Sequence, residues 1–129
     1  MKNKPTNEKI VGKDEKFDNS KFYLQYGIDL DRRRISIHGG INRENTSYVL
    51  RALQKMIDSS KTEAIDIYID TYGGYMYSAF AIYDAIRKAP CYVRTHAEGK
   101  VMSAGILIYL AGDERYTLPS STFMTLFGS

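Results

Sequence analysis

The sequence has few of the features that mark a secreted or membrane protein. Its 129 residues include one cysteine, Cys91, and no tryptophan. A lone cysteine cannot form an internal disulfide, and Cys91 lies in an apolar strand pattern, so we expect a buried thiol in a reducing compartment. The polar stretch 1–18 has no apolar core of the kind that a secretory signal requires. The longest apolar run, 106–110, is far shorter than the roughly 20 residues that cross a bilayer. These absences favour a cytoplasmic protein without a membrane contact.

The charge distribution gives little support to nucleic-acid binding. The formal net charge of +3 arises from 18 basic and 15 acidic residues scattered along the chain. Only the arginines at 32–34 form a tight basic cluster, which we expect to be a solvated strand entrance. With 43% hydrophobic residues the chain can bury the core of one domain. We predict a flexible polar arm at 1–20, with too little apolar surface to repay its ordering, followed by one domain at 21–129.

Hydrophobic spacing predicts an alternation of strands and helices. Strands are expected at 35–37, 65–69, 91–95, 115–118 and 123–127, with a turn at Gly39-Gly40 after the first. The caps at 45–47 predict a helix with an apolar face; Gly73-Gly74 opens a second helix, and a third runs from 103 to 111 with Gly112 as its cap. The two expected apolar faces are Val49, Leu50, Leu53, Met56 and Ile57, and then Met76, Ala79, Phe80, Tyr83 and Ile86. This order predicts an α/β fold with a mostly parallel sheet and flanking helices.

Two glycine-containing motifs, 71–74 and 99–105, follow successive strands of the predicted sheet. The carboxyl ends of parallel strands meet at one edge, so both motifs can face one site. Gly74 has no side chain to block a substrate backbone, and its N–H can donate. Ser103 begins a helix, so the amide of Ala104 lacks a partner within that helix. Two amides that converge in this way form an oxyanion hole beside Ser103, which then acts as a nucleophile.

Each motif alone has a simpler explanation. A serine after a glycine at a helix start is most often only an N-cap. A Gly-Gly pair after a strand is often a phosphate-binding loop or a turn. The occurrence of both, each at a strand end, is more specific and favours a catalytic site.

From about Ile35 to Leu126 the sequence resembles the proteolytic subunit of the Clp protease, within the wider crotonase-like superfamily. The family's Asn-Ser-Pro-Gly-Gly segment is similar to 70–74, where the two glycines are kept and Tyr72 replaces the proline. Its Gly-x-Ala-Ala-Ser-Met motif, followed by Gly or Ala, matches at Gly99, Ser103 and Gly105, with Val101, Met102 and Ala104 as substitutions. Its Ile-Tyr-Asp helix segment appears at 82–84, and its Arg-Tyr/Phe-x-Leu-Pro-Asn-Ser segment is similar to 115–121. The substitutions resemble those of divergent, phage-type members.

The resemblance implies a Clp protease-like fold that is incomplete at its C-terminus. It also implies that Ser103 is the nucleophile of a serine-type endopeptidase and that the amides of Gly74 and Ala104 form the oxyanion hole. The implied substrates are peptides or unfolded proteins. The implied assembly is a homo-oligomer of stacked heptameric rings with an AAA+ unfoldase as partner. ATP would be used by that unfoldase, so no cofactor or metal is expected on this chain.

The catalytic base is the point where the sequence departs from the family. There a histidine closes a Met-x-His segment, whereas here 124–126 ends in Leu126. The family's triad aspartate and its long helix lie beyond Ser129. His38 and His96 are expected to be structural, with His96 directed toward sheet packing and away from Ser103. Without a base a serine hydroxyl is barely nucleophilic, and loss of the histidine costs a serine protease on the order of 10⁶ in turnover. We therefore expect an inactive or very weak peptidase.

Two other interpretations remain open at this point. The chain could be a non-catalytic paralogue in a mixed peptidase ring. It could also be a crotonase-like acyl-CoA enzyme, because that superfamily uses the same paired amides for thioester enolates. The Ser103 motif and the 115–119 segment favour the peptidase, since crotonases need no serine at that position.

The first prediction concerns Leu126. Leu126→His restores a proton acceptor but no orienting carboxylate, so it is expected to recover slight hydrolysis of an activated ester and little or no peptide cleavage. Addition of the family's C-terminal region is expected to raise activity much further. Initial rates with an activated ester and a peptide check this. Ser103-dependent peptide cleavage by the unmodified chain would point to another base, with His96 the first suspect.

Overall fold

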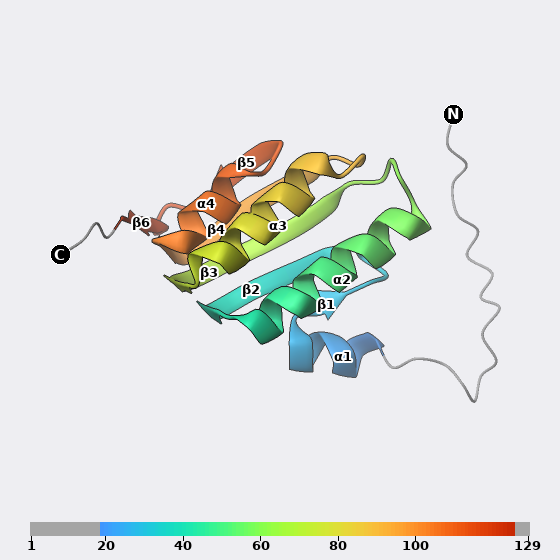
Figure 1. Ribbon diagram of the computed structural model, residues 1–129, viewed down its shortest axis with the longest axis horizontal. Helices are drawn as coiled ribbons and strands as arrows, with labels where there is room; N and C mark the ends of the chain where they lie inside the picture. Colours follow the sequence, from blue (N-terminus) through green and yellow to red (C-terminus); the bar gives the residue numbers. More distant parts are fainter. Residues whose placement is uncertain (1–18, 126–129) are drawn as a thin grey trace.

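The computed structural model describes residues 19–125, which form a mostly parallel sheet with helices packed along it (Figure 1). The strands follow the order β1-β2-β3-β4-β5, and β6 pairs with the end of β4. The elements are α1 (Asn19–Tyr26), β1 (Ile28–Asp29), β2 (Arg34–Ile41), α2 (Arg43–Ser59), β3 (Ile65–Gly74), α3 (Met76–Lys88), β4 (Val93–Met102), α4 (Ala104–Leu110), β5 (Glu114–Thr117) and β6 (Thr122–Met124).

The topology confirms the predicted fold class. Only β1 and β2 pair antiparallel, and the other pairings are parallel. Figure 1 shows α2, α3 and α4 side by side over the same face of the sheet, with α1 at the β1 edge. Between these layers Ile65, Ile67 and Ile69 of β3 are fully buried at every second position, as strand geometry requires. No helix within residues 19–125 is long and apolar enough to cross a bilayer.

The first long helix begins earlier than its predicted cap. Its N-cap is Asn42, whose side chain accepts from the Asn45 amide, while Asn45 Oδ1 accepts from the Asn42 amide, both at 2.9 Å. This reciprocal pair is a capping box. Of the predicted caps at 45–47, Asn45 does take part in the capping box, but all three residues lie inside the helix and the N-cap itself is Asn42. The predicted apolar face is confirmed, since Val49, Leu53 and Met56 are buried.

The apolar stripe predicted for α3 is correct in part. Of its five residues Ala79 and Ile86 are buried and Tyr83 packs against the core, whereas Met76 and Phe80 remain 46% and 44% exposed. The helix also buries Ser78 and Ile82, which the predicted stripe left out. The strand before it runs on to Gly74, and the amide of Tyr75 donates to Ile41 O at 3.0 Å, which attaches the N-cap of α3 to β2.

The Gly39-Gly40 pair is part of β2, so the predicted turn was wrong. The strand continues to Ile41, and the register with β3 shifts between the two glycines. Gly39 has φ +83°, a conformation that glycine adopts without strain. The sequence signal for a chain reversal therefore marks a bulge inside the sheet.

Both ends of the chain lie largely outside the described residues. Of the predicted arm at 1–20, only Asn19 and Ser20 are described, and they belong to α1. At the other end β6 covers the first two residues of the predicted strand 123–127, and 126–127 are outside the described part.

Arg33 is buried at the end of α2, 6% exposed, although we expected a solvated cluster at 32–34. Its guanidinium donates to Met56 O at 2.6 Å, Ser60 O at 3.0 Å, Glu63 O at 2.8 Å and Ala64 O at 3.1 Å. Only Met56 of these acceptors belongs to α2, and its carbonyl also accepts from the Ser60 amide; the other three follow the helix. Arg33 therefore joins the start of β2 to the last turn of α2 and to the segment that leads into β3.

The second prediction tests this role of Arg33. Arg33→Ala removes the guanidinium that donates to four carbonyls and is expected to lower the free energy of unfolding by about 2–4 kcal/mol. Arg34→Ala removes an exposed neighbour of the same type and is expected to change it by less than about 0.5 kcal/mol. Urea titrations followed by circular dichroism measure both. Equal midpoints for the two variants would show that the guanidinium contributes nothing at this position.

Candidate active site

The ends of β3 and β4 bring Gly73 against Ser103. A side chain at Gly73 would place its Cβ 2.9 Å from Ser103 Cβ, 3.2 Å from Met102 O and 3.5 Å from Ala104 N. Real Cβ atoms do not approach another carbon so closely, and Gly73 also has φ +106°. The two predicted motifs therefore meet, and glycine at 73 is what allows the contact.

Ser103 occupies a sharp turn between β4 and α4. Its backbone angles are φ 52° and ψ −120°, and within residues 19–125 only Arg33 shares a positive φ with it among non-glycine residues. A strained strand-to-helix turn of this kind presents the nucleophilic serine in α/β-hydrolases. Ser103 is half-buried, and its hydroxyl makes no hydrogen bond to another residue in the described part of the chain. The backbone conformation thus sets the direction of the side chain, and the hydroxyl is not used as a helix cap.

The two glycines of the first motif have different surroundings. The Gly73 amide donates to Thr71 Oγ1 at 3.0 Å, so this N–H is already engaged. Gly74, the last residue of β3, packs against the backbone of β2, because a Cβ added at Gly74 would collide with Ile41 O. Gly73 thus provides the close approach to Ser103, and Gly74 remains the predicted oxyanion donor. Ala104 is the first residue of α4, so its N–H has no partner within the helix.

The C-terminal strand passes directly beside the nucleophile. Met102 pairs with Met124, and the Ser103 amide donates to Met124 O at 2.8 Å. Leu126, which stands at the predicted base position, lies outside the described residues. The strand β6 therefore reaches the nucleophile through its backbone.

The positive φ of Gly99, inside β4, has a neighbour on β3 that explains it. Gly99 has φ +69°, and a Cβ there would fall 3.0 Å from Asp70 Oδ1. The Lys100 amide donates to the same oxygen at 3.2 Å, and Lys100 Nζ lies 3.5 Å from it. Beside this contact the register between β3 and β4 shifts. Asp70 therefore fixes the path by which β4 reaches Ser103.

His96 lies away from the nucleophile, as predicted. Its ring stacks between Tyr68 and Tyr116, with centroids at 4.3 and 5.0 Å, and its Nε2 is 2.8 Å from Asp66 Oδ1. It lies seven positions before Ser103 along β4, roughly 20 Å at the usual rise of a strand. The other histidine, His38, is half-exposed, with Nε2 3.8 Å from Glu98 Oε1. Neither is placed to take a proton from Ser103.

Asp66 on β3 is joined by side-chain hydrogen bonds to Arg94 and His96 on β4. Arg94 donates to both Asp66 oxygens, at 2.8 and 3.0 Å. Burial raises the pKa of Asp66, but the hydrogen bonds and charges of Arg94 and His96 outweigh burial and hold the pKa below its ordinary value. Asp66 is thus ionised at neutral pH and committed to its partners. Within the described residues no group of three or more acidic, histidine or cysteine side chains is placed to hold a metal ion.

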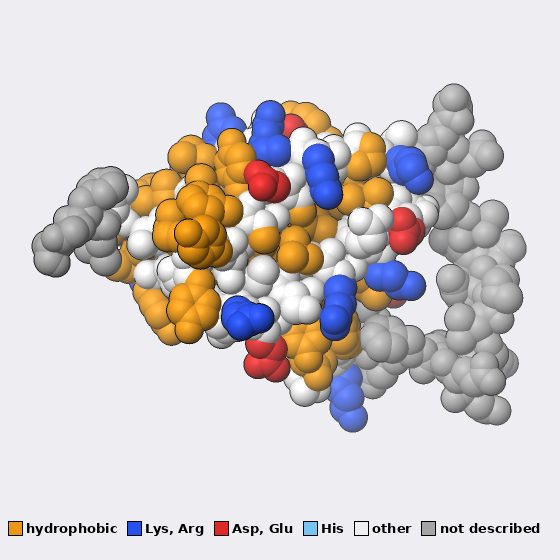
Figure 2. Space-filling model, viewed as in Figure 1, with side chains coloured by type: hydrophobic (Ala, Val, Ile, Leu, Met, Phe, Trp, Pro, Cys, Tyr) orange, Lys and Arg blue, Asp and Glu red, His pale blue; other side chains and the backbone are white. Residues whose placement is uncertain are grey.

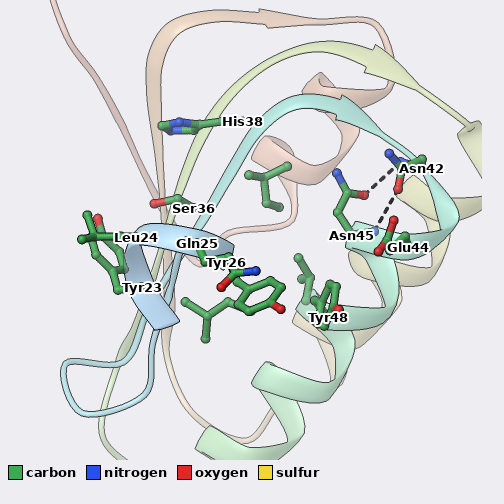
Figure 3. A pocket seen from close by; sticks show the side chains of 14 residues that line it. Tyr23, Leu24, Gln25, Tyr26, Ser36, His38, Asn42, Glu44, Asn45 and Tyr48 are labelled. Atoms are coloured by element: carbon green, nitrogen blue, oxygen red, sulfur yellow. Dashed lines mark hydrogen bonds between the residues drawn. The ribbon is translucent and has the colours of Figure 1, made fainter. Parts of the chain in front are cut away.

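A separate cavity of about 500 Å³ lies between α1, β2 and the start of α2. Figure 3 shows His38 and Ser36 on one side of it and Tyr26 and Tyr48 on another. The rings of Tyr26 and Tyr48 have centroids 4.9 Å apart and join α1 to α2. None of the predicted site residues lines this cavity. It is distinct from the Ser103 site.

An apolar groove runs between the first turns of α2 and α3, with Leu50, Tyr75, Met76 and Tyr77 among its lining residues. Tyr75 and Tyr77 are 61% and 87% exposed. In Figure 2 hydrophobic side chains gather at the end of the molecule where α3 begins. Because Tyr75 follows Gly74 directly, this surface adjoins the candidate site.

The structure is thus a mostly parallel α/β sheet in which a serine with positive φ lies beside a glycine at a strand end. A sequence model of the Clp protease family matches residues 18–126. The chain therefore belongs to the Clp protease family, which confirms the resemblance. The family is named after a serine peptidase, the Clp protease.

Similar proteins were found among curated sequences and solved structures. ATP-dependent Clp protease proteolytic subunit 2 of Treponema denticola is 40% identical over 99 residues, covering 74% of this chain and 48% of that protein. The subunit 2 of Pseudomonas aeruginosa is 33% identical over 103 residues, 78% of this chain and 50% of that protein. ClpP1 from Listeria monocytogenes superposes with a TM-score of 0.70 at 34% identity, covering 74% of this chain and 56% of that structure. The chain spans about half the length of the curated relatives it matches.

The third prediction tests the contact at Gly73. Gly73→Ala forces its Cβ against Ser103 and is expected to lower the free energy of unfolding by about 2–4 kcal/mol. Gly39→Ala is the matched control, because φ is +83° and nothing lies within 4 Å of the added carbon. It is expected to cost only about 1 kcal/mol of backbone strain. Thermal and urea unfolding compare the pair, and equal losses would show that the contact with Ser103 is not tight.

Proposed function

We propose that this chain carries the nucleophile and the oxyanion hole of a Clp-type serine peptidase site. Ser103 Oγ attacks the carbonyl carbon of a peptide, and the amides of Gly74 and Ala104 stabilise the resulting oxyanion. The amine then leaves with a proton, and water hydrolyses the acyl-serine. The observation that carries the proposal is the strained turn at Ser103 with Gly73 packed against it.

The oxyanion hole is expected to supply most of the catalysis that this chain can perform. One preorganised donor contributes about 3–4 kcal/mol to transition-state stabilisation. The turn holds Ser103 and Ala104 in one rigid piece, so the donor does not have to move during the reaction. This separates the site from an ordinary N-cap, because the serine side chain makes no capping bond in α4.

The proton acceptor is the limiting component. Within residues 19–125 no titratable side chain bonds to Ser103, and Leu126 cannot accept a proton. In serine proteases the oxyanion hole and binding alone leave a rate of roughly 10³–10⁴ over water. We therefore propose that the chain acylates slowly with activated esters and does not turn over peptides at a useful rate.

Substrate and assembly follow from the family as proposals for the whole protein. A peptide in extended form suits a site at a strand end, and the groove beside Tyr75 offers apolar surface for its side chains. Assembly into rings with further copies and action with an ATP-using unfoldase are proposed on the same basis. Location in the cytoplasm is proposed with them.

The fourth prediction concerns the acyl-serine. Incubation with p-nitrophenyl acetate is expected to acetylate Ser103 slowly, and intact mass with peptide mapping locates the adduct. Ser103→Ala removes the adduct, while Ser59→Ala, an exposed serine at the end of α2, leaves its rate unchanged. An adduct that persists in Ser103→Ala, or one that maps to another residue, contradicts the assignment of the nucleophile.

A further inference from the structure

Thr71 lies at the junction of the three elements that build the site. It belongs to β3 and is completely buried. Its Oγ1 donates to Gly39 O on β2 and accepts from the Gly73 amide at 3.0 Å. Its hydroxyl thus connects the neighbouring strand with the glycine that touches Ser103.

The sheet is irregular at this position on both sides. Toward β2, Thr71 pairs with Gly39 but the next pair is Gly73 with Gly40, so the ladder skips a residue. Toward β4, the register jumps between the pairs of Ile69 and of Thr71. A bulge interrupts the backbone ladder and leaves polar groups to be satisfied by other means. Here the Thr71 hydroxyl serves both Gly39 O and the Gly73 amide.

The methyl group of Thr71 packs against the helix that follows Ser103. A side chain at Gly105 would put its Cβ 2.3 Å from Thr71 Cγ2, so this methyl lies directly on the α4 backbone. A β-branched side chain has a stiff χ1, and here both of its branches have partners. One side chain therefore fixes Gly73 on one side of the site and α4 on the other.

We propose that Thr71 is the positioning residue of the oxyanion hole, an inference that rests on the proposed function. The hydroxyl holds the Gly73 amide, and the peptide that carries the Gly74 N–H follows it directly. The bond therefore restricts where the Gly74 donor lies relative to Ala104. Loss of the hydroxyl removes this restriction without removing Ser103 or either donor. A displacement of about 1 Å in a catalytic group can cost on the order of 10²-fold in rate.

The chain offers a matched control in Thr95. This threonine is equally buried, lies on the adjacent strand, and donates through Oγ1 to Tyr109 O at 2.7 Å. It contacts Gly112 at the far end of α4, where a Cβ would fall 2.4 Å from Thr95 Oγ1. Thr95→Val therefore removes a buried hydroxyl of the same kind at a distance from Ser103.

The experiment uses the full chain with Leu126→His, which supplies the base, and p-nitrophenyl acetate as substrate. Thr71→Val keeps the shape and removes the hydroxyl; it is expected to lower kcat about 10- to 100-fold with KM changed less than about twofold. It is also expected to speed hydrogen exchange of the Gly73 amide about 10-fold. Thr71→Ser keeps the hydroxyl and is expected to stay within about threefold of the parent in both measurements. Thr95→Val is expected to lower the thermal midpoint by a similar amount without either effect.

Failure of the inference and failure of the proposed function give different results. If Ser103→Ala leaves ester hydrolysis unchanged, the proposed function is wrong, and Gly73 exchange alone then decides whether the Thr71 hydroxyl holds the segment. If hydrolysis depends on Ser103 but Thr71→Val matches Thr95→Val in kcat and in Gly73 exchange, the inference is overturned. A loss in Thr71→Ser as large as in Thr71→Val overturns it as well, because the hydroxyl would then not be the cause.

Discussion

The structure depends on the close approach of two backbones, the carboxyl end of β3 and the first turn of α4. Glycine at 73 and at 105 permits this approach, since a Cβ at either position would fall within 3 Å of Ser103 or Thr71. The approach has a functional consequence because it gives the Ser103 turn a rigid surface to lie on. A positive φ at a serine is unfavourable and persists only where its surroundings over-determine it. The contacts of Gly73, Thr71 and Met124 supply that constraint.

The same region shows why the sheet is irregular where it is functional. Regular parallel pairing would carry β2, β3 and β4 to a common end and leave no space for a turn. The register shifts beside Gly39 and Asp70 let each strand advance by a different length. The strand ends are thereby staggered, and the segment 99–105 can lie against the segment 71–74, where Gly73 meets Ser103. Polar groups released by these shifts are taken up by the Thr71 hydroxyl and the Asp70 carboxylate. The bulges are thus part of how the site is built.

The sequence predicted those parts of the structure that depend on local periodicity. The isoleucines of β3 recur at every second residue, and the apolar residues of α2 recur at helical spacing, so both elements could be predicted from the sequence. The motifs around Gly73 and Ser103 could also be placed at strand ends. Features set by distant contacts could not be predicted. Arg33 bonds to carbonyls 23 to 31 residues away, and no local signal distinguishes it from its two neighbours. The attachment of α3 to β2 through the bond from Tyr75 to Ile41 is of the same kind, and the different surroundings of Gly73 and Gly74 depend on Thr71.

Chain geometry also limits where a base for Ser103 can come from. His96 is near Ser103 in the sequence, yet it lies about 20 Å back along an extended strand and is held by Asp66 between two tyrosine rings. The Ser103 amide is instead bonded to Met124 O, a residue 21 positions later that strand pairing brings beside it. Strand pairing, and not nearness in the sequence, therefore decides which described residues lie next to the nucleophile.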